Sequence, residues 1–249
     1  MKTLINLASA VLIMLSATSV SANAQGNKPL EVIVFPGGFN WPIFVAQEKG
    51  YFTENGIAVN VIPTPNSKFQ MVGLIDGDFD ITMTAMDNVV AYSEGQGAAE
   101  TKNEPNIFAF MGVDNGFLRL VAIPDVKSYG DLKGKQVGVD ALTTGYAFVL
   151  RKMLELGGLK PDEFEFVEAG GVMSRFGALL KQEFAATLLV SPLEAAAEHQ
   201  GFNRLGNGSE TLGAYQGVVG AGPPGLGGSQ CGAACRLYKR LSDRNSLAL

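Results

Sequence analysis

Signals for β-strands and α-helices alternate along residues 30–221, and this order constrains the fold more than any other feature of the sequence. In the first half of the chain, apolar runs typical of strands occupy residues 30–35, 57–62, 79–84 and 107–111. Helical signals lie between them: Pro42 opens one helix and Gly50 ends it, while Asn66 or Ser67 caps another. This order predicts an α/β fold with mainly parallel sheets covered by helices on both faces.

A second unit of the same kind follows. Its strand signals occupy residues 118–123, 136–140, 164–167, 185–190 and 215–219. The clearest helix spans residues 146–154, where apolar residues recur on one face, and Thr143 or Thr144 is expected to cap its start. The pattern predicts a two-lobed protein, in which residues 25–115 form lobe 1, residues 116–204 form lobe 2 and residues 205–221 form a return segment to lobe 1.

The first 24 residues have the pattern of an export signal. Lys2 gives a basic start, residues 4–15 form an apolar run too short to span a bilayer, and Ala22 and Ala24 form a small-x-small cleavage site. A membrane anchor or a buried N-terminal helix would need a longer apolar stretch or amphipathic spacing. We therefore expect cleavage after Ala24 and a periplasmic mature protein.

The charge balance argues against several classes of partner. The chain has 249 residues, with 19 Lys plus Arg against 24 Asp plus Glu and a net charge of -5. No basic surface of the kind that neutralises phosphates is expected from this balance. Nucleic acid and anionic membranes are therefore not expected as partners.

Ligands in sheets of this kind bind in the loops beyond the carboxyl ends of the strands. In lobe 1, one such loop brings aromatic and amide side chains to a helix start, and a second offers a hydroxyl, a carboxylate and an amide. In lobe 2, the loops supply hydroxyls, backbone donors and glycines that let a ligand approach. The candidate ligand-binding residues are Gly38, Phe39, Asn40, Trp41, Thr84, Met86, Asp87, Asn88, Asp140, Thr143, Thr144, Gly145 and Gly171.

Several of these residues also have a structural interpretation. Trp41 forms either a flat wall for a ligand or a core anchor of lobe 1. Asp87 either binds a cationic or N–H-bearing ligand or simply caps a helix. Arg175 is a weaker candidate for ligand binding than the loop residues, because a helical arginine more often forms a salt bridge on the surface.

The sequence holds no recognisable catalytic or metal-binding pattern. His199, the one histidine, lies in an Ala-rich helical stretch without a nucleophile motif or a second ligand at metal spacing, so an exposed structural role is expected. We expect no cofactor, no metal and no catalysis. Cys231 and Cys235 fit a local disulfide in an oxidising compartment or two ligands of a metal, and their spacing alone is specific for neither.

Three motifs in order resemble the ABC-transporter solute-binding proteins for sulfonates, nitrate, taurine and thiamine-precursor pyrimidines. They are residues 42–52 (PIFVAQEKGYF), Gly73 with residues 77–81 (GDFDI), and residues 131–135 (DLKGK) with 137–139 (VGV). The resemblance covers about residues 30–220. It implies a type II periplasmic-binding-protein fold, in which a monomer holds a small organic solute between two lobes and delivers it to an ABC permease in the inner membrane.

The resemblance leaves two alternatives of other classes. Pyrimidine-forming and dehydratase-type enzymes resemble these binding proteins and share their fold, so the fold alone does not exclude catalysis. The export signal and the lack of paired acid and base groups favour binding. A sensory module that presents the ligand to a receptor is a third option.

Residues 222–249 depart from the family pattern. This tail carries a net charge of +3 against -8 for residues 1–221, and it begins with a Gly- and Pro-rich run without helical periodicity. Because the family continues with helices that complete lobe 1, we expect lobe 1 of this chain to be incomplete. The tail is interpreted either as a flexible segment or as the product of a reading-frame error, since codons can be chosen so that the adjacent frame encodes an amphipathic helix.

Overall fold

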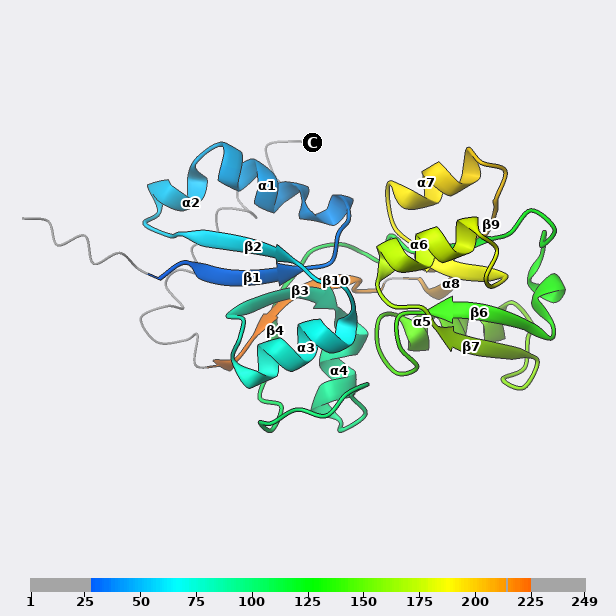
Figure 1. The fold of residues 1–249 in the computed structure, drawn as a ribbon, viewed down its shortest axis with the longest axis horizontal. Helices are drawn as coiled ribbons and strands as arrows, with labels where there is room; N and C mark the ends of the chain where they lie inside the picture. The colour runs from blue at the N-terminus through cyan, green and yellow to red at the C-terminus, as the bar shows by residue number, and fades with distance from the viewer. Residues whose placement is uncertain (1–27, 214, 225–249) are drawn as a thin grey trace, which may run out of the picture.

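The computed structural model describes residues 28–213 and 215–224, which form two lobes, each built on a five-stranded sheet (Figure 1). The predicted two-lobed α/β fold is therefore confirmed. Residues 1–24, expected to be an export signal, lie outside the described residues, as do Cys231, Cys235 and all of the tail beyond Pro224. Within the described ranges, no helix has both the length and the apolar character that a membrane crossing requires.

Lobe 1 contains the strands that come first and last in the described chain. Its sheet has the order β2-β1-β3-β10-β4, made of β1 (Leu30–Val34), β2 (Val59–Pro63), β3 (Ile81–Ala85), β4 (Phe108–Gly112) and β10 (Val218–Gly222). Its helices are η1 (Gly38–Asn40), α1 (Trp41–Glu48), α2 (Tyr51–Glu54), α3 (Ser67–Asp76) and α4 (Met86–Ser93). Figure 1 shows α1 and α2 on one side of this sheet and α3 and α4 on the other.

Lobe 2 is built from the middle of the chain. Its sheet has the order β7-β6-β8-β5-β9, made of β5 (Arg119–Ala122), β6 (Lys135–Val139), β7 (Phe164–Glu168), β8 (Ala186–Leu189) and β9 (Asn203–Asn207). Its helices are η2 (Tyr129–Leu132), α5 (Ala147–Leu156), α6 (Val172–Leu180), α7 (Leu193–Glu198) and α8 (Gly208–Leu212). The chain thus enters lobe 2 between β4 and β5 and returns to lobe 1 between α8 and β10.

Each sheet combines parallel and antiparallel pairs. In lobe 1, β1 pairs in parallel with β2 and β3, whereas the returning β10 is antiparallel to β3 and β4. In lobe 2, β6 pairs in parallel with β7 and β8, whereas β5 is antiparallel to β8 and β9. The expectation of mainly parallel sheets thus holds for the βαβ units, while the strands next to the crossovers, β5 and β10, run the other way.

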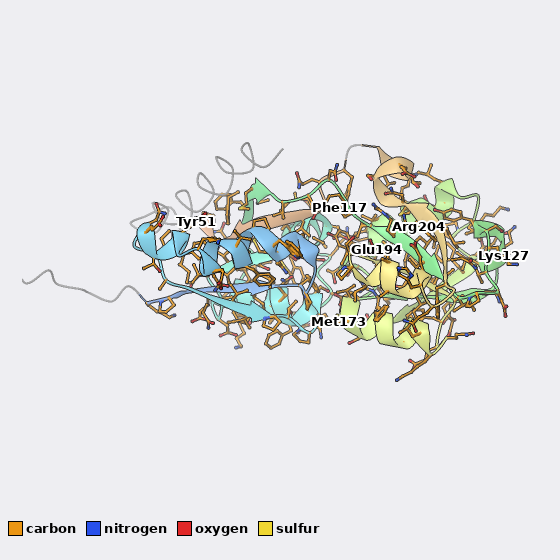
Figure 2. All side chains as sticks on the ribbon, turned by 90° about the horizontal axis from the view of Figure 1, so that it is seen from above. Tyr51, Phe117, Lys127, Met173, Glu194 and Arg204 are labelled. Carbon is orange, nitrogen blue, oxygen red and sulfur yellow. The ribbon has the colours of Figure 1, made fainter. Side chains whose placement is uncertain are left out.

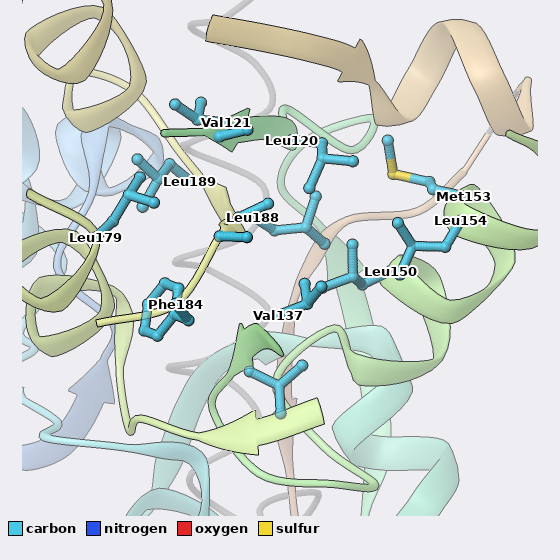
Figure 3. Packing of buried hydrophobic residues seen from close by; sticks show 14 of the residues in the cluster. Leu120, Val121, Val137, Leu150, Met153, Leu154, Leu179, Phe184, Leu188 and Leu189 are labelled. Atoms are coloured by element: carbon cyan, nitrogen blue, oxygen red, sulfur yellow. The ribbon is translucent and has the colours of Figure 1, made fainter. Parts of the chain in front are cut away.

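The largest hydrophobic core lies in lobe 2. Leu120, Val137, Leu150, Met153 and Leu189 are buried there between the sheet and its helices (Figure 3). The apolar face predicted for residues 146–154 supplies the α5 side of this core. Burial of such side chains is the main favourable term in folding, so lobe 2 is a firm platform for the loops at its strand ends.

Replacing Leu150 with alanine is therefore expected to lower the free energy of unfolding by about 2–5 kcal/mol, because the change leaves a cavity in the core. Leu156, on the same helix, is 55% exposed. Leu156→Ala provides the matched control and should change stability by about 0.5 kcal/mol or less. Urea unfolding followed by circular dichroism measures both values, and equal losses for the two variants would contradict this packing.

Candidate ligand-binding site between the lobes

Loops from both lobes enclose a cavity at their junction. Its atom-free space is about 410 Å³, a figure that includes the open solvent at its mouth. Most of its walls are apolar, and the two lobes share them: Phe35, Pro36, Phe39, Ala85 and Val218 come from lobe 1, and Leu118, Val172, Leu188 and Val190 come from lobe 2. The lining also includes Asp140, Gly145, Tyr146 and Arg175. Such a cavity suits a compact ligand with an apolar body.

The start of α3 forms several hydrogen bonds to lobe 2. The Ser67 backbone N–H donates to both carboxylate oxygens of Asp140, at 3.2 and 3.0 Å, and the Ser67 and Thr144 hydroxyl oxygens lie 2.7 Å apart. Asn66 accepts a hydrogen bond from the Phe69 N–H, so the expected N-cap of this helix is confirmed. The carboxylate of Asp140, from lobe 2, thus lies at the positive end of a lobe 1 helix, where a negative charge is stabilised.

Backbone groups at three glycines add to this interface. Gly38 donates its N–H to the Ser191 carbonyl at 2.9 Å, and Gly171 donates to the Pro65 carbonyl at 3.0 Å. Gly145 donates to the Asn88 side-chain oxygen at 2.5 Å. At Gly171, a Cβ atom would collide with the Pro65 carbonyl, so this close approach requires glycine.

The lobes also approach at the rim of the junction. Lys68 and Glu168 form an ion pair at 2.7 Å. Because both side chains are partly exposed, this pair contributes little to stability. Figure 2 shows Phe117, on the crossover into lobe 2, and Glu194, on α7, near the same junction. The lobes are therefore in direct contact around the cavity.

The expected capping role of Thr143 and Thr144 is wrong. Helix α5 begins at Ala147, and the preceding residue, Tyr146, has a left-handed backbone (φ 70°) and no capping side chain. Thr144 is instead buried against Ser67 of the other lobe, while Thr143 is half-buried. The spacing to an apolar helix is compatible with a cap, but the turn at Gly145 and Tyr146 moves the helix start further along the chain.

Thr84 and Asn88 belong to a buried polar chain within lobe 1. The Asn88 amide donates to the Thr84 hydroxyl at 2.8 Å, and that hydroxyl donates to the Gln70 side-chain oxygen at 2.7 Å. The Gln70 amide in turn donates to the Met83 carbonyl at 3.1 Å. These residues hold the carboxyl end of β3 against α3 and α4, so that Asn88 can receive the Gly145 N–H from lobe 2.

Asp87 is buried without a hydrogen-bond partner. Its side chain is 9% exposed, and neither carboxylate oxygen has a partner among the described residues. Burial raises the pKa of Asp87 from 3.8 to about 7; the nearby backbone N–H groups of Tyr146 and Asn88 oppose this rise, and the charge of Asp140 adds to it. The interpretation of Asp87 as a helix cap is wrong, because Ala85 is the N-cap of α4 and no side chain caps that helix.

Arg175 lies in the cavity wall and not on the surface. It is 5% exposed, and its guanidinium donates to the Gly170 carbonyl at 2.9 Å and to the Leu188 carbonyl at 3.4 Å. Burial lowers the pKa of Arg175, and the nearby charge of Asp140 opposes this effect. The expected surface salt bridge is therefore wrong. The signal in the sequence is that Arg175 shares the spacing of the buried residues Val172 and Leu179 on α6.

Two tyrosines lie close together here, and the sequence did not single them out as ligand-binding residues: Tyr146 lines the cavity, whereas Tyr215 lies near Tyr146 outside the lining. Burial raises the pKa of Tyr146 well above its usual value, with Asp114 and Tyr215 adding to the rise. Burial likewise raises the pKa of Tyr215, and the charges of Asp87 and Asp114 add to it. The Tyr215 hydroxyl is buried and has no hydrogen-bond partner among the described residues. Both side chains therefore stay neutral and offer hydroxyl groups.

The remaining predicted residues divide between the cavity and the scaffold. Phe39 lines the cavity, while Asn40 is fully buried and donates to the Phe35 carbonyl at 2.6 Å. Met86 packs on the cluster beside β10. Trp41 is 71% exposed and belongs to neither the cavity lining nor a core cluster, so its interpretation as a core anchor is wrong.

Outside the cavity, the structure describes few candidates for chemistry. His199 is exposed after the end of α7, as expected. Within residues 28–213 and 215–224, no three His, Cys, Asp or Glu side chains gather as a metal site would require. The cavity between the lobes is therefore the candidate ligand-binding site.

Thr144→Val should weaken the contact between the lobes, because it leaves the buried Ser67 hydroxyl without its partner. We expect the free energy of unfolding to fall by about 1–3 kcal/mol and the radius of gyration to increase in small-angle X-ray scattering. Thr143→Val is the matched control, one residue away, and should change neither quantity measurably. An equal effect of both substitutions would refute the role of the Ser67 and Thr144 hydroxyls.

The burial of Asp87 should also make the stability of the protein depend on pH. Because the pKa of Asp87 rises to about 7 on folding, the folded state binds the proton more tightly than the unfolded state. The contribution of Asp87 to the free energy of unfolding is therefore largest below about pH 4, and it falls by a few kcal/mol as the pH rises towards 7. Asp87→Asn should remove this slope and stabilise the protein at pH 8, whereas Asp125→Asn, at an exposed position, should leave the slope in place. Urea unfolding at several pH values measures it, and an unchanged slope in Asp87→Asn would contradict the assignment.

Comparison with known proteins places the chain in a family. The NMT1/THI5-like family model matches residues 40–204. Among curated proteins, the 4-amino-5-hydroxymethyl-2-methylpyrimidine phosphate synthase THI11 of Saccharomyces cerevisiae is 28% identical over 157 residues, which is 57% of this chain and 40% of the yeast protein. The chain therefore spans less than half the length of this relative.

Solved structures share the fold at low sequence identity. The alkanesulfonate-binding protein SsuA from Xanthomonas axonopodis pv. citri, bound to MOPS, has a TM-score of 0.72 and 15% identity, covering 89% of this chain and 74% of its own. The periplasmic nitrate-binding protein NrtA from Synechocystis PCC 6803 has a TM-score of 0.73 and 11% identity, covering 86% and 60%. At this identity the similarity establishes a common fold.

Proposed function

The chain belongs to the NMT1/THI5-like family, and from that premise we propose that it is the extracytoplasmic solute-binding component of an ABC importer. In this role it captures a small organic solute of the sulfonate, nitrate, taurine or pyrimidine type between its lobes. It then delivers the solute, as a monomer in the periplasm, to a permease in the inner membrane. The export-signal pattern of residues 1–24 and the names of the structural neighbours support this assignment.

The observation that carries the proposal is the cavity itself. Its walls come from both lobes, and its polar side chains come from lobe 2: Asp140 and Tyr146 from the loop after β6, and Arg175 from α6. A solute in this position contacts both lobes at once, so it binds the closed arrangement more tightly than an open one. Binding then shifts the population towards closure, by as much as the two affinities differ.

A second candidate is an enzyme that forms a pyrimidine on the same fold. The observation in its favour is the sequence match to the yeast synthase, which covers 40% of that protein. Against it, the one acid in the cavity lining, Asp140, accepts the Ser67 N–H and lies near the buried charge of Arg175. Mass spectrometry that detects chemical conversion of a bound solute by the purified protein alone would establish the enzyme.

The proposal predicts that at least one compound from a panel of sulfonates, nitrate, taurine and pyrimidines raises the melting temperature. At a concentration 100 times its Kd, a solute that binds the folded state alone contributes about 2.7 kcal/mol to stability. Where the compound co-purifies, denaturation should release it, and mass spectrometry should identify it as the same compound.

Two matched variants locate the effect. Val190→Phe fills part of the cavity and should abolish the thermal shift, whereas Val90→Phe, on the exposed face of α4, should preserve it. If no compound of the panel shifts the melting temperature and none co-purifies, the solute-binding role is refuted. A shift that survives in Val190→Phe would place the solute elsewhere.

A further inference from the structure

Two stretches of chain connect the lobes, and they touch each other beside lobe 1. The outgoing crossover leads from β4 to β5, and the returning crossover leads from α8 to β10 and ends at Gly217. At Gly217, a Cβ atom would collide with the Asp114 carboxylate and with the Gly116 backbone, so this close approach requires glycine. The two crossovers are therefore in direct contact.

Asp114 joins the two crossovers through four hydrogen bonds. Its carboxylate accepts the Gly116 N–H at 2.7 Å, within the outgoing crossover, and the Val218 N–H at 3.1 Å, at the start of β10. Its backbone carbonyl accepts the Gly217 N–H at 3.1 Å and the Gln216 side-chain amide at 2.8 Å. Three of the four bonds reach the returning chain, and we call the set the crossover clamp.

The crossover clamp lies between the parts of the chain that belong firmly to one lobe. On its lobe 1 side, the Val113 N–H donates to the Val218 carbonyl at 2.9 Å, which continues the pairing of β4 with β10. On its lobe 2 side, the Gly208 N–H donates to the Leu118 carbonyl at 2.8 Å. Between these bonds, Gly116 has a left-handed backbone with φ 86°. Hinges of two-lobed proteins bend at a few loop residues of this kind, so movement between the lobes is expected here.

The clamp restricts how one lobe can move against the other. Two separate connections would let the lobes twist and slide as well as close, because each connection rotates about its own backbone bonds. Connections that are joined by hydrogen bonds act as one hinge. The bonds across the junction, such as those of Ser67 to Asp140 and of Gly171 to Pro65, form only when the loops meet within about 3 Å. They depend on this restriction.

We propose that Asp114 is the positioning residue of the hinge: it joins the outgoing and returning crossovers, so that closure brings the loops of the two lobes into register. Asp114 lines an open hollow beside the crossovers and not the cavity between the lobes. It therefore acts on solute binding through the arrangement of the lobes. The inference rests on the proposed function, in which closure holds a solute, and it is tested in the solute-free protein.

Hydrogen exchange of single amides, followed by NMR, tests the clamp. Asp114→Asn keeps one oxygen for the Gly116 N–H and places an amide nitrogen, which cannot accept, at the Val218 N–H. Exchange of the Val218 amide should become at least about tenfold faster. The Ser67 and Gly171 amides, which donate to the other lobe and not to the crossovers, should also exchange several times faster. A change at these two amides distinguishes a positioning role from a local one.

Three comparisons control the result. The Leu120 amide, in the lobe 2 strand β5 between two neighbouring strands, should keep its exchange rate. Asn115→Ala changes the adjacent, exposed residue and should leave all rates unchanged. Gln216→Ala removes one bond of the clamp at an exposed position and should act in the same direction but more weakly, so it tests the clamp even if Asp114→Asn does not fold.

Faster exchange confined to Val218 would give Asp114 a local role and overturn the inference, as would an unchanged rate at Val218. Equal acceleration at Leu120 would indicate a general loss of stability and would also contradict it. Solute binding is decided separately, by the thermal-shift panel. A compound that raises the melting temperature keeps that function even where the clamp fails, and faster exchange at Ser67 and Gly171 supports the clamp even where no compound binds.

Discussion

The arrangement of the two lobes depends on a carboxylate from one lobe placed at the start of a helix in the other. Asp140 follows β6 in lobe 2 and receives the Ser67 N–H at the start of α3 in lobe 1. Two features of the chain make this contact possible: the first N–H groups of α3 have no partner within the helix, and an acid, Asp140, directly follows β6. Ser67 and Thr144 then add a buried hydroxyl pair beside it. Together with the backbone contacts at Gly38, Gly145 and Gly171, this contact holds the walls of the cavity together.

The hydrogen bonds between the lobes form without a solute, so the groups that hold the lobes together need no hydrogen bond from it. Asp140, Ser67, Thr144 and the backbone groups at Gly38 and Gly171 satisfy one another across the junction without a solute. A solute therefore gains little by replacing them. It gains affinity mainly from the apolar walls of the cavity. The apolar residues of the lining take no part in these hydrogen bonds, so they remain available to the solute.

The fold is predictable from the sequence because it depends on local periodicity. The strand signals and the amphipathic α5 match observed elements to within a few residues, and Asn66 caps α3 as its position predicts. The exception is β9 (Asn203–Asn207), for which the sequence pattern predicts no strand. Prediction is less successful where a side chain is defined by a partner far along the chain. Thr144 resembles a helix cap until Ser67, 77 residues earlier, is placed against it. Arg175 resembles a surface residue until Gly170 and Leu188 accept its hydrogen bonds.

Asp87 can be recognised in the sequence, but its environment cannot be predicted from it. An acid at the start of a helix is ordinarily stabilised by the helix dipole and by water, and nothing in the local sequence distinguishes Asp87 from that case. The difference arises in three dimensions, where lobe 2 covers the acid and brings a second carboxylate, Asp140, near it. Desolvation then outweighs the helix dipole, because taking a carboxylate out of water costs several kcal/mol whereas the dipole contributes about 1 kcal/mol.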